Sequence, residues 1–286
     1  MAKVLVLRTA GVNCDEETAH AFKLAGGEVS IRHVGSLLRG EDALDNFDIL
    51  AIPGGFSYGD DLGAGTVLAN QLRTRLADDL HAFVDEGKLV IGICNGFQVL
   101  VRLGILPGWE GDKAASLIEN VSGKFEDRWI HLRVETDQCA FLDCSGEHSE
   151  PCARYLRAPV AHREGRFVLR DPDMVDRLRE NGQIALTYRV SAGEDDQEPG
   201  AAEGAYPANP NGSVLDIAGI CNEKGNVLGL MPHPERFVHR LQAPCWTRNP
   251  PDASESTLES LSRAGDGFSI FSGAIGFVND RADKIR

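Results

Sequence analysis

The sequence predicts an α/β protein whose mainly parallel open sheet is covered by helices on both faces. Short apolar runs recur through the amino-terminal third, segments with helical spacing separate several of them, and the connections are brief. Strands and helices that alternate in this way favour parallel pairing, and parallel strands are buried on both faces. The ligand crevice of such a sheet lies beyond the carboxyl ends of its strands.

The amino-terminal elements follow one another closely. Lys3–Arg8 runs apolar and stops at a polar loop, so it is the first predicted strand. Glu16–Ala25 has helical spacing and ends at a Gly-Gly pair, which is a signal for a helix C-terminus. Val29–Val34 and Asp48–Ile52 are the next strands, and Pro53–Gly55 halts the second of them.

Later elements are predicted on the same grounds. An amphipathic helix is expected at Leu72–Glu86, a fourth apolar strand at Leu89–Ile93, and a helix at Phe97–Leu103. The remaining predictions are strands at Trp129–Glu135, Phe167–Arg170 and Ile184–Val190, a hairpin of Leu215–Asn222 with Asn226–Met231, and a last helix at Phe268–Val278.

We expect one domain over residues 1–286, because no repeat and no linker divides the chain. Two polar stretches, near residues 191–211 and 242–264, are rich in Pro and in small or polar residues, and they are predicted to be surface insertions.

Composition excludes several classes of function. The net charge of −14 argues against a nucleic-acid partner, since phosphate binding needs a basic face. No run of eighteen apolar residues exists, so no membrane span is expected. The amino terminus lacks the layout of a signal peptide, and we therefore expect a cytosolic protein.

The seven cysteines are an odd number, and without a secretion signal they are expected to be reduced. Cys139, Cys144, His148 and Cys152 fall within a short stretch that could suggest zinc. Their irregular spacing lacks the usual C-x-x-C pairs, so no metal site is predicted.

The segment Gly92–Gly96 (GICNG) has the layout of a nucleophile elbow centred on Cys94. A tight strand-to-helix turn holds such a nucleophile in a strained backbone conformation, and only small residues fit around it. The amino terminus of the following helix favours the thiolate of Cys94. It also offers the N–H of Asn95 to a developing oxyanion.

The segment Met231–Arg236 (MPHPER) supplies the groups that a thiolate nucleophile needs. His233 can accept the thiol proton and return it to the leaving amine. Glu235, two residues later in a proline-stiffened segment, can fix the tautomer of that imidazole. The sequence thus predicts a Cys94, His233 and Glu235 triad.

A second oxyanion donor is predicted at Gly55, in the loop that follows the third strand. Glycines there let the backbone approach a substrate and direct an N–H at it.

These motifs together resemble the class I glutamine amidotransferases, which have a flavodoxin-like sheet. Within that class the strings PGGFSYGDDL, GICNGFQVL and NGSVLDIAGICNEKGNVLGLMPHPER are similar to those of the glutaminase subunits of phosphoribosylformylglycinamidine synthase. The segment Ile105–Gly108 resembles their LLPG. The likeness runs from Lys3 to Arg236, and the last helix also fits it.

The resemblance implies a reaction and its partners. Cys94 would attack the side-chain amide of glutamine, giving a γ-glutamyl thioester and ammonia, and water would then release glutamate. The ammonia would reach a separate synthetase subunit, which uses ATP to convert formylglycinamide ribonucleotide to the amidine in purine biosynthesis. No cofactor is expected in this chain; ATP and magnesium belong to the synthetase, and a small accessory subunit is a further expected partner.

The same resemblance assigns residues to the glutamine pocket. Gln98 and the backbone at Gly55 and Asn95 would hold the substrate, and His162 would border the pocket. The family commonly reads His-Gly-Glu-Gly where this chain has His162–Gly165 (HREG), so the role of His162 stays open. Asn120–Arg128 is similar to the large single-chain synthases, and the partner surface is therefore expected to be modified.

Two other classes remain as alternatives. A cysteine hydrolase of the DJ-1 and PfpI type shares the elbow and the sheet, but its histidine normally follows the cysteine directly, where this chain has Asn95. A non-catalytic subunit that only binds a partner is opposed by the intact Cys94, His233 and Glu235.

Overall fold

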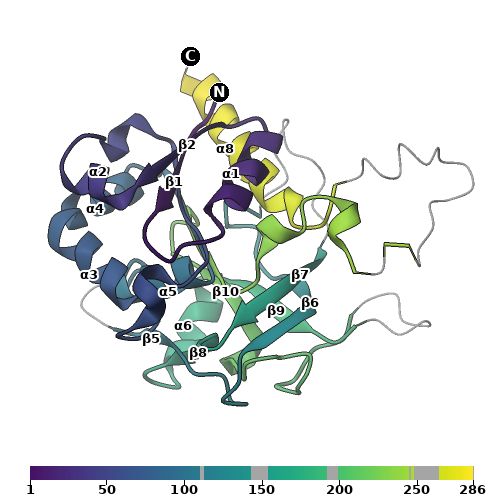
Figure 1. The fold of residues 1–286 in the computed structure, drawn as a ribbon. Coiled ribbons are helices and arrows are strands. Elements are labelled where there is room, and N and C mark those ends of the chain that lie inside the picture. The colour runs from purple at the N-terminus through teal and green to yellow at the C-terminus, as the bar shows by residue number, and fades with distance from the viewer. Residues whose placement is uncertain (110–112, 143–153, 192–198, 245, 248–263, 286) are drawn as a thin grey trace, which may run out of the picture.

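The computed structural model describes residues 1–109, 113–142, 154–191, 199–244, 246–247 and 264–285 (Figure 1). Within these ranges nine strands form one sheet in the order β2-β1-β3-β4-β11-β10-β9-β6-β7. Their bounds are β1 Lys3–Arg8, β2 Glu28–His33, β3 Ile49–Ile52, β4 Leu89–Ile93, β6 Glu126–Val134, β7 Tyr155–His162, β9 Ile184–Arg189, β10 Ile217–Cys221 and β11 Val227–Leu230. A separate antiparallel pair consists of β5 (Ala115–Ile118) and β8 (Arg166–Leu169).

The predicted open sheet is confirmed, and it has two halves. Strands β2, β1, β3, β4 and β11 run parallel, and every residue of β3, β4 and β11 is buried, as in a sheet covered on both faces. The predicted hairpin of β10 and β11 reverses the direction, and β10, β9, β6 and β7 then pair antiparallel.

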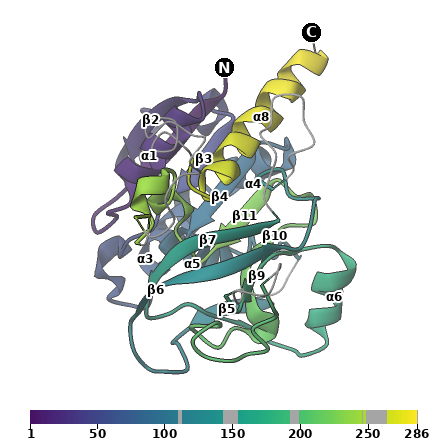
Figure 2. The ribbon, with the colours of Figure 1, turned by 90° about the vertical axis from the view of Figure 1, so that its right-hand side faces the viewer.

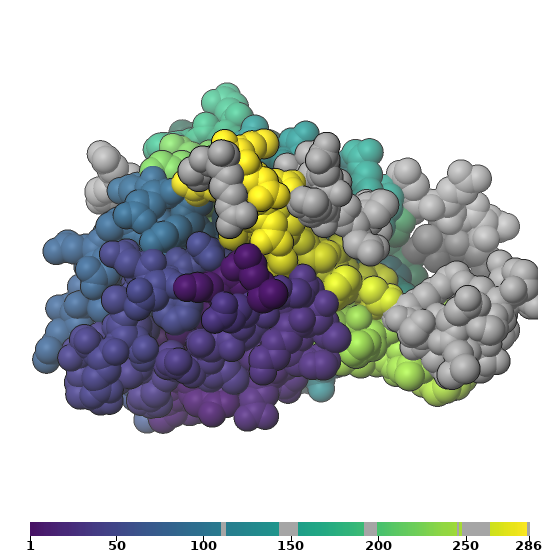
Figure 3. Space-filling view, turned by 90° about the horizontal axis from the view of Figure 1, so that it is seen from above, coloured from purple at the N-terminus to yellow at the C-terminus, as the bar shows by residue number. Residues whose placement is uncertain are grey.

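Helices lie on both faces of the parallel half (Figures 1 and 2). Those helices are α1 Asp15–Leu24, α2 Val34–Leu38, α3 Thr66–Arg75, α4 Ala77–Asp85, α5 Asn95–Leu103 and α8 Phe268–Ile285, while α6 (Met174–Glu180) lies beside the antiparallel half. Helices α1 and α8 contact each other, with the rings of Phe22 and Phe271 edge to face at 4.9 Å. The space-filling view shows α8 in yellow lying along the purple amino-terminal segment (Figure 3). Helices α3 and α5 pack together on the opposite face.

One predicted helix is wrong in its extent. Leu72–Glu86 is not continuous, because Leu76 has non-helical backbone angles (φ −135°, ψ 15°) and separates α3 from α4. Asp78 and Asp79 lie in the first turn of α4, where acidic side chains stabilise a helix amino terminus. These two residues favour a new helix start there.

The segment 191–211 differs in part from the predicted surface insertion. Residues 192–198 lie outside the described ranges, but Asn209 and Asn211 are buried and hydrogen-bonded within the protein. Most of the second predicted insertion, residues 248–263, also lies outside the described ranges. In the part of the chain that the structure describes, no helix combines the length and apolar character needed to span a membrane.

Candidate active site

Four loops meet at the carboxyl edge of the parallel half of the sheet. They follow β1, β3, β4 and β11, and they carry Cys14, Gly54 with Gly55, Cys94 and His233, respectively. Because parallel strands share one carboxyl edge, residues more than 200 positions apart in the chain come into contact there.

Cys94 occupies a strained turn between β4 and α5. Its backbone angles are φ 51° and ψ −102°, an unusual conformation for a residue with a side chain. A β-carbon on Gly96 would stand 1.9 Å from the carbonyl oxygen of Ile52, and one on Gly92 would stand 2.6 Å from that of Gly96. The two glycines of the predicted elbow are therefore required by the available space.

The thiol of Cys94 is almost completely enclosed, with 5% of the residue exposed. Its backbone N–H donates to Leu230 O at 2.7 Å, which ties the turn to β11. The sulfur lies 3.8 Å from Ala161 O in β7. Helix α5 begins at the next residue, so unpaired N–H groups of its first turn lie close to the sulfur.

His233 and Glu235 form a buried pair in the loop after β11. His233 Nδ1 lies 2.6 Å from Glu235 Oε1, and both residues are 1% exposed. A short 3₁₀ turn at Pro234–Arg236 brings the two side chains together, and the N–H of His233 donates to Pro159 O at 2.8 Å. The carboxylate accepts the Nδ1 proton, which leaves the lone pair of the neutral imidazole on Nε2.

The electrostatic surroundings favour a charged His233. Burial by itself lowers the pKa of His233, but the negative charges of Glu235 and Cys94 outweigh this and raise the pKa well above its usual value. His233 Nε2 is buried and makes no hydrogen bond to any other described residue. Cys94 is thus near enough to affect the charge of the imidazole. The Nε2 atom remains available for proton transfer to or from a substrate.

The loop after β3 brings two glycines against the histidine loop and the β1 loop. Gly55 has φ +140°, and a β-carbon there would stand 2.8 Å from the backbone of residues 11–13. Gly54 lies against His233, and the carbonyl oxygen of Gly54 accepts a hydrogen bond from the N–H of Cys14 at 3.3 Å.

The side chains of Asn95 and Gln98 fasten neighbouring loops to α5. Asn95 Oδ1 accepts the N–H of Ser57 at 3.2 Å, and Asn95 Nδ2 donates to Gln98 Oε1 at 3.0 Å. Gln98 Nε2 donates to Glu164 O at 2.7 Å. Both polar ends of the Gln98 side chain therefore have protein partners, and its direct effect is to hold the loop at Glu164.

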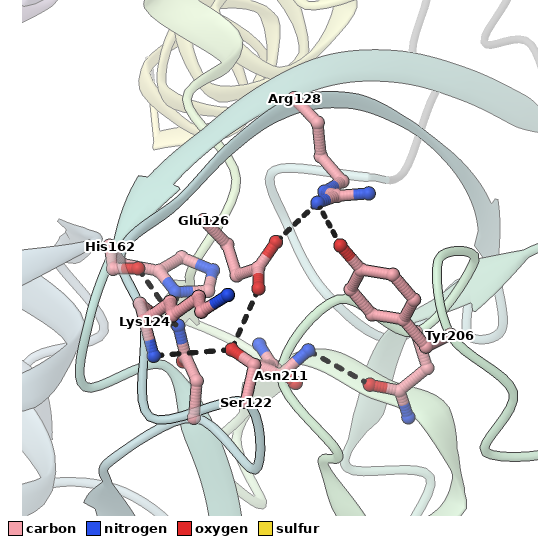
Figure 4. Close-up of polar contacts among 9 residues, drawn as sticks. Ser122, Lys124, Glu126, Arg128, His162, Tyr206 and Asn211 are labelled. Carbon is pink, nitrogen blue, oxygen red and sulfur yellow. Dashed lines mark hydrogen bonds and ion pairs between the residues drawn. The ribbon is translucent and has the colours of Figure 1, made fainter.

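His162 is buried at the end of β7 (Figure 4), and its contact with Asn120 fixes its tautomer. Asn120 Nδ2 donates at 2.9 Å to the backbone carbonyls of Lys124 and His162, so Asn120 Oδ1 faces the ring. Oδ1 lies 3.2 Å from His162 Nδ1 and accepts the N–H of Gly165 at 3.0 Å. An amide oxygen only accepts, so Nδ1 carries the proton and Nε2 the lone pair.

The Nε2 atom of His162 is a preorganised acceptor in the same region. It is buried and has no hydrogen-bond partner among the described residues. Burial lowers the pKa of His162 to about 3, and the nearby charge of His233 adds to this effect. The ring therefore stays neutral at physiological pH. It lies against Gly165, where a β-carbon would come within 2.3 Å of Nδ1.

A second polar layer surrounds this histidine (Figure 4). Glu126 accepts hydrogen bonds from Ser122 Oγ and from Arg128, and Arg128 also donates to the hydroxyl of Tyr206. Asn211, in the segment predicted as an insertion, donates to Gly165 O at 2.9 Å. Residues 199–211 thus support the loop at the candidate site.

The sequence analysis did not single out several residues at this site. Cys14 and Arg236 contact each other beside His233, and Asp60 accepts from Asn95 Nδ2 at 3.1 Å. Burial raises the pKa of Asp60, while its hydrogen bonds to Gly65 and Asn95 lower it less. The position of Cys14 in the loop between the first strand and the first helix was the available signal, because that loop reaches the carboxyl edge of the sheet.

Possible metal ligands occur at two places. Of the cysteines considered for zinc, Cys139 is buried, while Cys144 and Cys152 lie outside the described residues, as does His148. At the candidate site, ligand-type atoms of Cys14, His233 and Glu235 lie within 4.8 Å of one another. The guanidinium of Arg236 is only 3.0 Å from the Cys14 sulfur, and this positive charge opposes a cation there.

Comparisons with known proteins agree over nearly the whole chain. Residues 1–278 match the model of the CobB/CobQ-like glutamine amidotransferase domain. The phosphoribosylformylglycinamidine synthase subunit PurQ of Dehalococcoides mccartyi is 44% identical over 96% of each chain. The PurQ subunit of Treponema denticola is 45% identical over 82% of this chain and 88% of its own.

Solved structures give the same picture of the fold. A chain in the structure of PurLQS from Thermotoga maritima is 30% identical, with a TM-score of 0.67 over 97% of this chain and all of that chain. A GMP synthase protein from Thermoplasma acidophilum, described as putative, is 13% identical with a TM-score of 0.52 over 100% of this chain and 98% of its own, which is a likeness of fold alone.

Proposed function

The chain belongs to the CobB/CobQ-like glutamine amidotransferase domain family, and we propose that it is the glutaminase subunit of a phosphoribosylformylglycinamidine synthase. It releases ammonia from glutamine, and a synthetase subunit uses that ammonia to convert formylglycinamide ribonucleotide to the amidine. The relatives named for this synthase support the assignment, because they are 40–45% identical over most of their length.

The observation that supports the chemistry is the electrostatic effect of Cys94, in its strained turn, on the buried His233–Glu235 pair. The Cys94 thiolate attacks the side-chain carbonyl carbon of glutamine, and His233 donates a proton to the departing nitrogen. Ammonia leaves and a γ-glutamyl thioester remains. His233 then takes a proton from water, the resulting hydroxide adds to the thioester, and glutamate and the thiolate are regenerated. Glu235 keeps the imidazole in the required tautomer.

Backbone donors are proposed to stabilise the tetrahedral intermediates of this reaction. The N–H of Asn95 lies at the amino terminus of α5, and Gly55 is held with φ +140° in the facing loop. Fixed donors of this kind need no reorganisation during the reaction. Gln98 contributes indirectly, through its hydrogen bond to Glu164 O.

His162 is proposed to accept a hydrogen bond from the bound glutamine. Its Nε2 carries a lone pair, is buried and lacks a partner among the described residues. A buried acceptor without a partner is costly, and an N–H of the substrate can satisfy it. The low pKa of about 3 keeps it an acceptor at neutral pH.

The proposed partners are a synthetase subunit and a small accessory subunit. A likeness to a chain of the PurLQS structure supports such an assembly. The chain itself needs no cofactor for this chemistry, and ATP and magnesium are assigned to the synthetase. We place the complex in the cytosol.

Reconstitution tests the proposed function. The chain is co-purified with the candidate synthetase, and glutamine-dependent ADP formation is measured with formylglycinamide ribonucleotide. A glutamine-analogue affinity label should modify Cys94. Labelling at another cysteine, or ADP formation that does not respond to glutamine, would contradict the proposal. A cysteine hydrolase of the DJ-1 and PfpI type would release no ammonia to a synthetase.

A further inference from the structure

Cys14 is a second cysteine at the candidate site, and the proposed reaction gives it no role. It lies between β1 and α1 and is completely buried. It occupies the amino-terminal cap position of α1, but its side chain makes no capping hydrogen bond. Its sulfur is directed instead toward the loop after β11.

Three polar groups surround this sulfur. Arg236 Nη2 donates to it at 3.0 Å, and the thiol donates to Asn13 Oδ1 at 3.2 Å. His233 Nδ1 lies 3.9 Å away. That separation allows only a weak hydrogen bond, because Glu235 already accepts the Nδ1 proton, and the sulfur contacts the edge of the ring mainly by packing.

These contacts restrain His233 from several sides. Glu235 and Cys14 lie at its Nδ1 edge, and Gly54 lies against Cε1. Gly54 is in turn tied to Cys14, whose N–H donates to Gly54 O at 3.3 Å. Cys14 therefore links the loops after β1, β3 and β11 around one imidazole. Proton transfer is sensitive to small displacements of the base, so a link that holds the imidazole in place should increase the rate of glutamine hydrolysis.

We propose that Cys14 is a positioning residue of the glutaminase site, whose sulfur, held between Arg236 and His233, fixes the imidazole for proton transfer. The inference rests on the proposed function, since it concerns the histidine of that reaction. Cys14 does not act as a nucleophile here, because Arg236, Asn13 and His233 enclose its sulfur.

The charges around His233 give the proposal a pH-dependent consequence. The groups that face the imidazole are Glu235, Cys94, Cys14, Arg236 and His162. Burial lowers the pKa of His233, the Glu235 and Cys94 charges raise it, and a smaller contribution from Cys14 raises it further. Removal of the Cys14 sulfur should therefore lower the pKa of His233, so that the imidazole loses its proton at a lower pH.

The experiment compares Cys14→Ala and Cys14→Ser in the reconstituted complex. Cys221→Ala is the matched control, because Cys221 is equally buried but lies on β10 and contacts Gly182 O. Glutamine-dependent and ammonia-dependent synthesis are both measured across pH, together with KM for glutamine.

In Cys14→Ala, kcat with glutamine should fall about tenfold with little change in KM, which corresponds to about 1.4 kcal/mol. The alkaline limb of its pH profile should move to lower pH. Cys14→Ser, whose hydroxyl can still accept from Arg236 and donate to Asn13, should recover most of the rate. Ammonia-dependent synthesis should not change, and Cys221→Ala should match the wild type.

Other outcomes distinguish an error in the positioning role of Cys14 from an error in the proposed function. An unchanged rate and pH profile in Cys14→Ala would overturn the positioning role. Equal loss of glutamine-dependent and ammonia-dependent synthesis would also overturn it, because the role would then be structural. If the wild-type chain released no glutamate from glutamine even with the synthetase, the proposed function itself would fail.

Discussion

The imidazole of His233 lies so close to Gly54 that a β-carbon on Gly54 would stand 2.6 Å from Cε1. Glu235 and Cys14 hold the adjoining Nδ1 edge of the ring, which limits how far it can move. Gly54 is thus required by contact with the catalytic candidate, and this contact joins two loops that are far apart in the sequence.

Gly54→Ala should displace His233 and reduce glutamine-dependent synthesis. We expect a loss of about a hundredfold, because small misplacements of a catalytic group can cost that much. Ammonia-dependent synthesis in the same complex should persist. Gly200→Ala is the control, since a β-carbon at Gly200 would meet no atom within 4 Å. Full glutamine-dependent activity in Gly54→Ala would show that the histidine tolerates the displacement.

Cys94→Ala should abolish glutamine-dependent synthesis while the complex still uses added ammonia. Removal of a nucleophile leaves no route to the thioester, so the loss should reach at least about a thousandfold. Steady-state rates with glutamine and with ammonium chloride measure the two activities. If both rates vanished together, Cys94 would have a structural role instead.

The stability of the fold should depend on pH through His162. Its pKa is lowered from 6.5 to about 3 in the folded protein, so the unfolded chain binds the proton more readily. The neutral His162 therefore makes its full contribution to the free energy of unfolding above pH 6.5. That contribution is lost as the pH falls toward 3.

Urea unfolding of wild type and His162→Gln at pH 7 and pH 5 measures this effect. The free energy of unfolding should decrease more steeply in the wild type, by an excess that approaches about 1.4 kcal/mol per pH unit below the unfolded pKa. The raised pKa of His233 affects the free energy of unfolding of both proteins, so its effect largely cancels when their pH dependences are compared. Parallel pH dependences in the two proteins would refute the assignment of a neutral His162.

The isolated chain should hydrolyse glutamine slowly, and the synthetase should accelerate it. Gating of this kind prevents the release of ammonia without an acceptor. Glutamate formation is measured with the chain alone, with the synthetase, and with the synthetase plus its nucleotide substrates. Equal rates in all three conditions would exclude gating.

The parallel half of the sheet was predictable because its signals are local. The apolar runs of β1, β3 and β4 have few polar interruptions, and the Pro-Gly-Gly segment that contains Gly54 follows β3 directly. The antiparallel half was harder to predict. Strand β7 alternates buried and partly exposed residues and contains Pro159, and it pairs with β6 at the sheet edge.

The prediction of a single helix at Leu72–Glu86 was wrong because apolar spacing alone does not show where a helix breaks. The apolar spacing continues through the break at Leu76, and it conceals both the non-helical backbone of that residue and the helix-start signal of Asp78 and Asp79. The buried Asn209 and Asn211 were missed because polar residues normally favour exposed loops. Their burial depends on partners such as Gly165, which are distant in the sequence.

The sequence by itself predicted the candidate nucleophile, its histidine and its carboxylate, since the elbow and the His-x-Glu segment each consist of consecutive residues. Only the tertiary structure decided what surrounds them. Cys14, Gly54 and Arg236 reach His233 because β1, β3 and β11 end at one edge of the same sheet. Such contacts depend on strand order, and strand order is fixed by the packing of the whole chain rather than by any short segment of it.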